Sequence, residues 1–161
     1  MRRGPMPAVM LAFFVLCGCG SAQVWTGMCV GVADGDSIVV MHGGRAEKIR
    51  LYGIDCPEWH QDFGNRAKRF TSDMVFGKIV TVEPVDHDAY GRTVAWVSVK
   101  GKSLNRELLQ AGLAWWYRKY AADNRQLRGL EQAARKQRIG LWSQPNPVPP
   151  WRFRKAERRN H

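Results

Sequence analysis

Cysteine and histidine are both scarce in this sequence, and their scarcity excludes the commonest kinds of zinc site. The 161 residues include only 4 cysteines and 4 histidines, and no pair of CxxC motifs or Cys/His clusters stands at ligand spacing. No internal repeat is present either, so a solenoid is not expected. A chain of this length fits one domain with its own hydrophobic core.

Long hydrophobic runs are also missing. The apolar run at residues 9–16 is too short to span a bilayer as a mature helix, and it follows the basic residues Arg2 and Arg3. This arrangement is typical of an export signal, so residues 1–22 are predicted to be a signal peptide outside the fold. The mature protein is then expected to be periplasmic, secreted, or attached by a lipid to the bacterial envelope.

Two ways of cleaving this signal remain open. The sequence LCGC at residues 16–19 resembles a bacterial lipobox, which would leave Cys19 lipidated and anchor the protein to a membrane. The small residues GSA at 20–22 suit ordinary signal cleavage instead. After either cut, Cys29 and Cys56 remain in an oxidising compartment, where they could form a disulfide or stay as two separate half-buried thiols.

Acidic residues are few compared with basic ones. The chain has 14 Asp and Glu against 25 Lys and Arg, which gives a formal net charge of +11. This balance favours polyanionic partners, either nucleic acid or an anionic membrane surface. Charge alone does not choose between the two.

Five short β-type runs and three amphipathic segments organise the domain. Strands are expected at residues 30–32, 38–41, 47–52, 78–83 and 93–99. Apolar residues at helical spacing predict a helix at 65–75, a second one capped by Ser103, and a third that begins with a capping box at Asp123 and ends at Gly140. We therefore predict an α+β fold: a five-stranded OB-type β-barrel with one inserted helix and two C-terminal helices.

The domain is expected to occupy residues 25–143, followed by a tail at 144–161. The tail sequence is proline-rich and then basic, and proline cannot donate backbone hydrogen bonds. Since the segment also shows no apolar face, we interpret it as an irregular solvated tail whose Arg and Lys residues could hold phosphates.

Three motifs place carboxylates or an arginine at the end of a strand-like run. They are DGD at residues 34–36, IRLYGIDCPE at 49–58 and DAYGR at 88–92. In the strand at 47–52, Ile49 and Leu51 share one face, so Arg50 points to the other, toward a groove. Hard oxygen ligands, a carboxylate base and guanidinium groups are what metal-dependent phosphodiester cleavage needs.

These motifs resemble those of the staphylococcal (micrococcal) nuclease family, the thermonucleases. The resemblance extends from Trp25 to Trp142 and includes VADGDS at 32–37, IRL and GIDCPE within 49–58, DAYGR at 88–92, Asn105 with GLA at 112–114, and GLW at 140–142. It implies an exported, monomeric, Ca²⁺-dependent endonuclease that cleaves DNA and RNA to 3′-phosphorylated products. Little base specificity is expected, because contacts to phosphate and to stacked rings do not read base edges.

The resemblance also implies roles for individual residues. Asp36, Asp55 and the backbone carbonyl of Cys56 would coordinate Ca²⁺, which prefers hard oxygen ligands and tolerates carbonyls. Glu58 would be the general base for the attacking water. Arg50 and Arg92 would hold the oxygens of the phosphorane, for which a planar guanidinium suits better than an ammonium.

Tyrosines near Tyr90, Tyr117 and Tyr120 line the nucleotide pocket in this family, and an aromatic ring can stack a base or bind a terminal phosphate. The alignment through the sequence WWYRKYAADN is ambiguous, and at least one of its tryptophans is expected in the core. Asp34 is interpreted as a turn-forming or supporting residue.

The alternative function is a non-catalytic OB module that only holds nucleic acid. Related domains of that kind have lost their acids and arginines while keeping the barrel. This chain retains Asp36, Arg50, Asp55, Glu58 and Arg92, which favours the enzyme.

Overall fold

The computed structural model describes residues 23–159, so the predicted signal peptide and Cys19 lie outside the described residues. The strands are β1 (Trp25–Asp34), β2 (Ser37–His42), β3 (Arg45–Leu51), β4 (Ile54–Asp55), β5 (Ile79–His87), β6 (Thr93–Val99), β7 (Lys102–Ser103) and β8 (Trp115–Trp116). The helices are α1 (Gly64–Val75), α2 (Leu104–Gln110), α3 (Arg118–Ala121), α4 (Arg125–Lys136), the 3₁₀-helix η1 (Gly140–Ser143) and α5 (Pro150–Glu157). No helix in this part of the chain is both long and apolar enough to cross a membrane.

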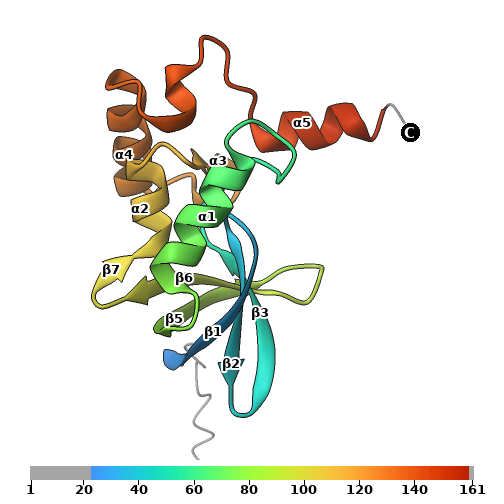
Figure 1. The fold of residues 1–161 in the computed structure, drawn as a ribbon, viewed down its shortest axis with the longest axis vertical. Helices are drawn as coiled ribbons and strands as arrows, with labels where there is room; N and C mark the ends of the chain where they lie inside the picture. Colours follow the sequence, from blue (N-terminus) through green and yellow to red (C-terminus); the bar gives the residue numbers. More distant parts are fainter. Residues whose placement is uncertain (1–22, 160–161) are drawn as a thin grey trace, which may run out of the picture.

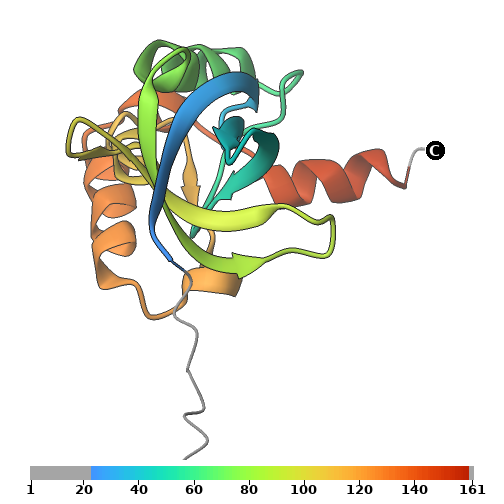
Figure 2. The same ribbon diagram turned by 90° about the horizontal axis from the view of Figure 1, so that it is seen from below.

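Five strands close into a mixed β-barrel, as predicted (Figures 1 and 2). Their hydrogen-bonded order is β3-β2-β1-β5-β6, and β6 then pairs with β3 in parallel, with Ile49 opposite Thr93 and Leu51 opposite Ala95. Closure leaves these strands with no free edge. The α+β fold on a five-stranded OB-type barrel is therefore confirmed.

Alternate residues of each strand fill the barrel. On β3, Ile49 and Leu51 are 0% and 1% exposed, whereas Arg50 faces the other way, as the period-2 pattern predicted. On β6 burial also alternates, with Ala95 and Val97 completely buried. Because of this alternation, one face of each strand packs into the core and the other presents polar side chains on the outside of the barrel.

Helices α2 and α4 pack together beside the barrel and bury Leu104, Leu108 and Leu127. The capping residue of α4 is Asn124 and not Asp123: its side-chain oxygen accepts a hydrogen bond from the Leu127 N–H at 3.0 Å. A residue caps a helix when its side chain reaches a free N–H of the first turn. Here that residue is Asn124, so α4 begins one residue later than the sequence pattern predicted.

The C-terminal segment is a second correction, because it contains the helix α5 where an irregular tail was predicted. Pro149 precedes this helix and Pro150 begins it, a position at which the missing proline N–H costs nothing. Trp151 and Phe153 are half-buried against the domain. Figures 1 and 2 show that α5 starts against the barrel and extends away from it.

Cys29 and Cys56 are both buried free thiols, so the structure has the unpaired arrangement. Burial raises the pKa of each thiol, most strongly that of Cys56, whose pKa the neighbouring carboxylate of Asp36 raises further.

Candidate active site

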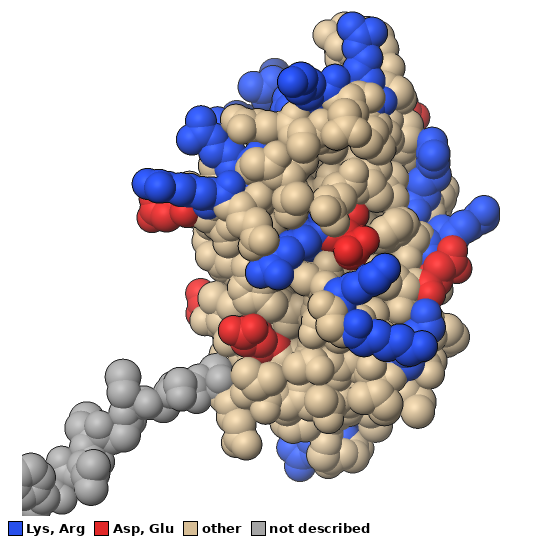
Figure 3. All heavy atoms as spheres, turned by 90° about the vertical axis from the view of Figure 1, so that its left-hand side faces the viewer, with Lys and Arg blue, Asp and Glu red and all other residues tan. Residues whose placement is uncertain are grey.

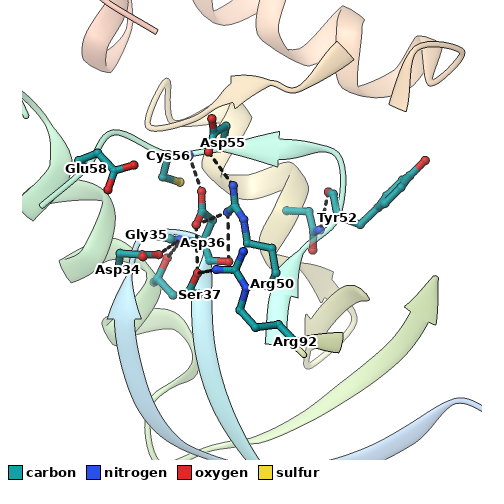
Figure 4. A network of polar contacts seen from close by, with 12 residues as sticks. Asp34, Gly35, Asp36, Ser37, Arg50, Tyr52, Asp55, Cys56, Glu58 and Arg92 are labelled. Atoms are coloured by element: carbon teal, nitrogen blue, oxygen red, sulfur yellow. Dashed lines mark hydrogen bonds and ion pairs between the residues drawn. The ribbon is translucent and has the colours of Figure 1, made fainter. Parts of the chain in front are cut away.

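The predicted catalytic and metal-binding side chains converge at one mouth of the barrel (Figure 4). They come from five places in the chain: the turn between β1 and β2, the end of β3, strand β4, the loop before α1, and the loop between β5 and β6. The residues are Asp36, Arg50, Asp55, Glu58 and Arg92.

Helix α1 holds the turn that carries Asp36. The Thr71 hydroxyl donates a hydrogen bond of 2.6 Å to the Gly35 carbonyl, and a Cβ at Gly35 would lie only 2.7 Å from the Ala67 Cβ. Glycine is therefore required at this position by close packing. The Asp36 N–H donates to the Asp34 side chain at 3.1 Å, so Asp34 forms the turn, as expected.

Arg50 lies between the two carboxylates predicted to bind metal. Its Nη2 donates to Asp55 Oδ1 at 2.6 Å and its Nη1 forms an ion pair with Asp36. The other oxygen of Asp36 accepts the Cys56 N–H at 2.5 Å, which places the Cys56 main chain beside both acids. The Asp36 and Asp55 side chains are only 7% and 1% exposed, so the guanidinium compensates charges that water does not reach.

Burial and charge act in opposite directions on these carboxyl groups. Burial alone would raise the pKa of Asp36, but the Arg50 charge and hydrogen bonds from its neighbours outweigh it and lower that pKa. Burial and the negative charge of Asp36 raise the pKa of Asp55 against the effect of its arginine partners. Partial burial and the neighbouring charge of Asp36 raise the pKa of the half-buried Asp34 to about 7. The mouth of the barrel thus brings three carboxyl groups close enough to shift one another's pKa.

Arg92 is held by its own loop. Its Nε donates to Asp88 Oδ2 at 2.7 Å, and Asp88 Oδ1 accepts the backbone N–H groups of Tyr90 and Arg92. Its Nη1 lies 3.4 Å from the Ser37 hydroxyl, so the remaining edge of the guanidinium points toward Arg50 (Figure 4). Two guanidinium groups therefore flank one space next to the buried carboxylates.

Glu58 lies on the far side of this space from Arg92 (Figure 4) and shares a partner with Asp55. That partner is Arg154 of α5, whose Nη1 is 2.6 Å from Glu58 Oε1 and whose Nη2 is 2.8 Å from Asp55 Oδ2. Sequence reasoning assigned Arg154 to a tail and missed this contact. The signal that could have found it is the pair of aromatic residues, Trp151 and Phe153, inside a basic segment that begins with proline.

The three predicted pocket tyrosines do not form one cluster. Tyr90 is 83% exposed on the loop between β5 and β6, where the Arg92 guanidinium lies 5.5 Å from its ring centroid. Tyr117 and Tyr120 pack edge to face at 5.1 Å near α3. Trp115 and Trp116 are both buried, which confirms that this segment contributes tryptophan to the core.

The described residues hold no group of three or more His, Cys, Asp and Glu side chains converging as a metal centre. A cation at this mouth would therefore be held by the pair Asp36 and Asp55 together with main-chain carbonyls and water.

Comparison with known proteins agrees with this geometry. The profile of the family described as staphylococcal nuclease homologue matches residues 48–144. The protein ParB of Escherichia coli is 39% identical over 159 residues, covering 92% of this chain and 89% of its own. An uncharacterized endonuclease of Escherichia coli O157:H7 is 43% identical over 129 residues, covering 80% of this chain and 84% of its own.

The micrococcal nuclease of Shigella flexneri is 36% identical over 151 residues, covering 86% of this chain and 87% of its own. With a matching family profile and nuclease relatives over most of its length, and with the acids and arginines of the site in place, the non-catalytic alternative is set aside. The chain belongs to the staphylococcal nuclease family and is a nuclease, a hydrolase of phosphodiester bonds.

Proposed function

We propose that this nuclease is a Ca²⁺-dependent endonuclease that cleaves DNA and RNA to 3′-phosphorylated products. The observation that carries the proposal is the convergence of three carboxylates and two guanidinium groups at one mouth of the barrel. Carboxylates can bind a cation or act as a general base, and guanidinium groups can bind a phosphate. One space therefore holds the groups that activate water and the groups that stabilise the phosphorane.

The donor set fits Ca²⁺. Asp36 and Asp55 offer hard oxygen atoms close enough for one guanidinium to bridge them, and Cys56, which follows Asp55, donates its N–H to Asp36. Two carboxylates with carbonyls and water make the irregular oxygen shell that Ca²⁺ accepts and Mg²⁺ does not favour. Bound there, Ca²⁺ would act as a Lewis acid on the phosphate and increase the acidity of nearby water.

The protein's own residues account for the remaining steps. Glu58 takes the proton of a water molecule whose oxygen bonds to phosphorus in line with the 5′ oxygen. As the P–O5′ bond breaks, Arg50 and Arg92 hold the equatorial oxygens of the phosphorane, and Arg92 stabilises the charge on the departing 5′ oxygen. The phosphate stays on the 3′ side.

The surface supports a polyanionic substrate. On the face drawn in Figure 3, Lys and Arg side chains stand out over several elements, while Asp and Glu form only small patches. Together with the net charge of +11, this distribution attracts phosphate backbones without reading sequence. Tyr90, Tyr117 and Tyr120 offer rings on which bases can stack.

We further propose that residues 1–22 direct export and that the mature enzyme acts as a monomer, either free or anchored through a lipid on Cys19. The basic and apolar pattern of the N-terminal sequence supports this proposal.

Digestion of plasmid DNA and of RNA with Ca²⁺, with Mg²⁺ and with a chelator tests the function. Cleavage is expected with Ca²⁺ alone, and the products should carry 3′-phosphate. In parallel, Glu58→Gln should lower turnover about 10²–10⁴-fold with little change in DNA affinity, because it removes the base and keeps the shape. Full activity in chelator, or equal activity with Mg²⁺, would contradict the metal assignment.

A further inference from the structure

Helix α5 lies outside the matched family profile, which ends at residue 144, yet it places a guanidinium in the active site. Arg154 Nη2 is 2.8 Å from Asp55 Oδ2, and its Nη1 is 3.3 Å from Asp55 Oδ1 and 2.6 Å from Glu58 Oε1. One side chain therefore contacts both a proposed metal ligand and the proposed base.

This contact covers the oxygen atoms that a cation would need. Asp55 Oδ1 accepts from both Arg50 and Arg154, and Asp55 Oδ2 accepts from Arg154. The Asp55 side chain is 1% exposed beneath these groups, whereas Arg154 itself is 35% exposed. A metal ion bound to Asp55 would lie next to the positive charge of the Arg154 guanidinium with nothing to screen the repulsion. The metal ion and Arg154 therefore compete for Asp55.

A second contact of α5 occupies a candidate base-stacking surface. The Trp151 ring is stacked on that of Tyr117, with centroids 5.5 Å apart and planes 12° from parallel. Trp151 and Arg154 are three residues apart and therefore lie on one face of α5. The same helix face thus covers the acids and the tyrosine, the two places where a metal and a base would bind.

Trp151 of α5 packs against Trp115 and Tyr117, and Phe153 packs against His60, while the polar contacts of this segment outside the site are mostly solvent-accessible. His60 Nε2 lies 2.6 Å from Glu157 Oε1, with side chains 34% and 41% exposed, and the Gln61 amide donates to the Val148 carbonyl at 2.5 Å. Within α5 itself only Pro150 is fully buried. Exposed ion pairs contribute little to stability, and the barrel closes through β3 and β6 without α5. Undocking of the helix therefore costs the Trp151 packing and the Arg154 ion pairs but leaves the barrel strands paired.

We propose that α5 is an autoinhibitory strap whose Arg154 competes with the divalent cation for Asp55 and Glu58. Strap docking and metal binding weaken each other, and the strap raises the metal concentration at which the nuclease becomes active. By linkage, the metal must weaken strap docking by the same factor by which the strap weakens metal binding. This inference rests on the proposed Ca²⁺ site.

Calorimetric titration of Ca²⁺ into the parent protein, Arg154→Gln and Arg158→Gln tests the competition. Arg158 is the C-cap residue that follows α5, is exposed, and carries the same charge without contacting the site. Arg154→Gln should lower the Kd for Ca²⁺ about tenfold, because it removes the charged hydrogen bonds with which Arg154 competes for Asp55 and Glu58. Arg158→Gln should change the Kd by less than about twofold. Equal Kd values for parent and Arg154→Gln would overturn the strap.

Hydrogen exchange of the parent protein supplies a second readout that needs no variant. Ca²⁺ should accelerate amide exchange in the peptide covering α5 and leave that of α4 unchanged. Ca²⁺ binding with unchanged or slower exchange in α5 overturns the strap and leaves the metal site standing. Absence of Ca²⁺ binding by all three proteins overturns the metal site and the strap together.

Discussion

The two arginines that flank the proposed phosphate position belong to regions built in different ways. Arg50 is at the end of strand β3, 13% exposed, between two carboxylates that water barely reaches. Arg92 is on the loop between β5 and β6, 28% exposed, and its partner Asp88 is 20% exposed. The first region is buried and positioned by barrel closure, whereas the second is a local, hydrated hydrogen-bond network.

This difference determines how catalysis and stability are coupled. In the strand region, the charges proposed to do the chemistry also form buried ion pairs, so removing one weakens or removes the pairing of another. In the loop region, water can replace a lost partner, and the loop can adjust to a substrate. We therefore expect substitutions in the strand region to reduce both stability and activity, and substitutions in the loop region to reduce activity with little loss of stability.

Replacing each arginine by methionine should separate the two regions most clearly. In chelator, Arg50→Met should lower the free energy of unfolding by about 3–5 kcal/mol, since it leaves the buried Asp36 without a guanidinium partner and Asp55 with Arg154 alone. Arg92→Met should lower it by about 1 kcal/mol or less. Both should reduce turnover by roughly 10²–10³-fold. Urea unfolding and DNA digestion measure these effects, and equal stability losses would remove the distinction.

The loop that carries Glu58 offers an intermediate case, because main-chain packing holds it. A Cβ at Gly64 would overlap the Glu58 carbonyl oxygen. Gly64→Ala should therefore destabilise the protein by about 1–3 kcal/mol and displace Glu58, with a loss of turnover. Gly129→Ala is the matched control: nothing lies within 4 Å of its added Cβ in α4, so it should stabilise by about 0.5–1 kcal/mol. A neutral Gly64→Ala would show that the loop moves freely.

Asp88 provides the smallest effect and a pH signature. Burial raises the pKa of Asp88, but hydrogen bonds from Arg92 and Tyr90 outweigh it, so the pKa lies below its usual 3.8. A carboxyl group with a lowered folded-state pKa adds stability above its unfolded pKa, and this stability is lost as the pH falls through the folded pKa.

Asp88→Asn should thus lower the unfolding free energy by about 1 kcal/mol at pH 7. The difference from the parent should shrink as the pH falls below 3.8 and vanish below the folded pKa. Unfolding curves across this pH range measure the difference in unfolding free energy. A difference that persists at lower pH would show that the variant loses stability through altered packing and not through the lost charge.

Most of the site was predictable because its residues stand in short motifs tied to strand ends. The alternation of Ile49 and Leu51 placed Arg50 on the polar face of β3, and the structure has it there. The role of Asp34 as a turn-former also followed from local chemistry. The metal, base and arginine roles themselves remain predictions for the experiments above.

Other features depended on contacts between distant parts of the chain. Arg154 is 99 residues from Asp55, and no local pattern connects them. The free thiols of Cys29 and Cys56 and the separation of Tyr90 from Tyr117 likewise depend on where the barrel places each segment. Helix α4 begins one residue later than its sequence pattern predicts, so Asn124 caps it and not Asp123.

The sequence by itself determined the barrel and which charged residues stand at its strand ends, because periodicity and turn residues act over a few positions along the chain. Only the tertiary structure decided which charges meet. An ion pair depends on distance in space, so Arg50 between Asp36 and Asp55, and Arg154 on Asp55 and Glu58, exist only after the barrel has closed and α5 has packed against it.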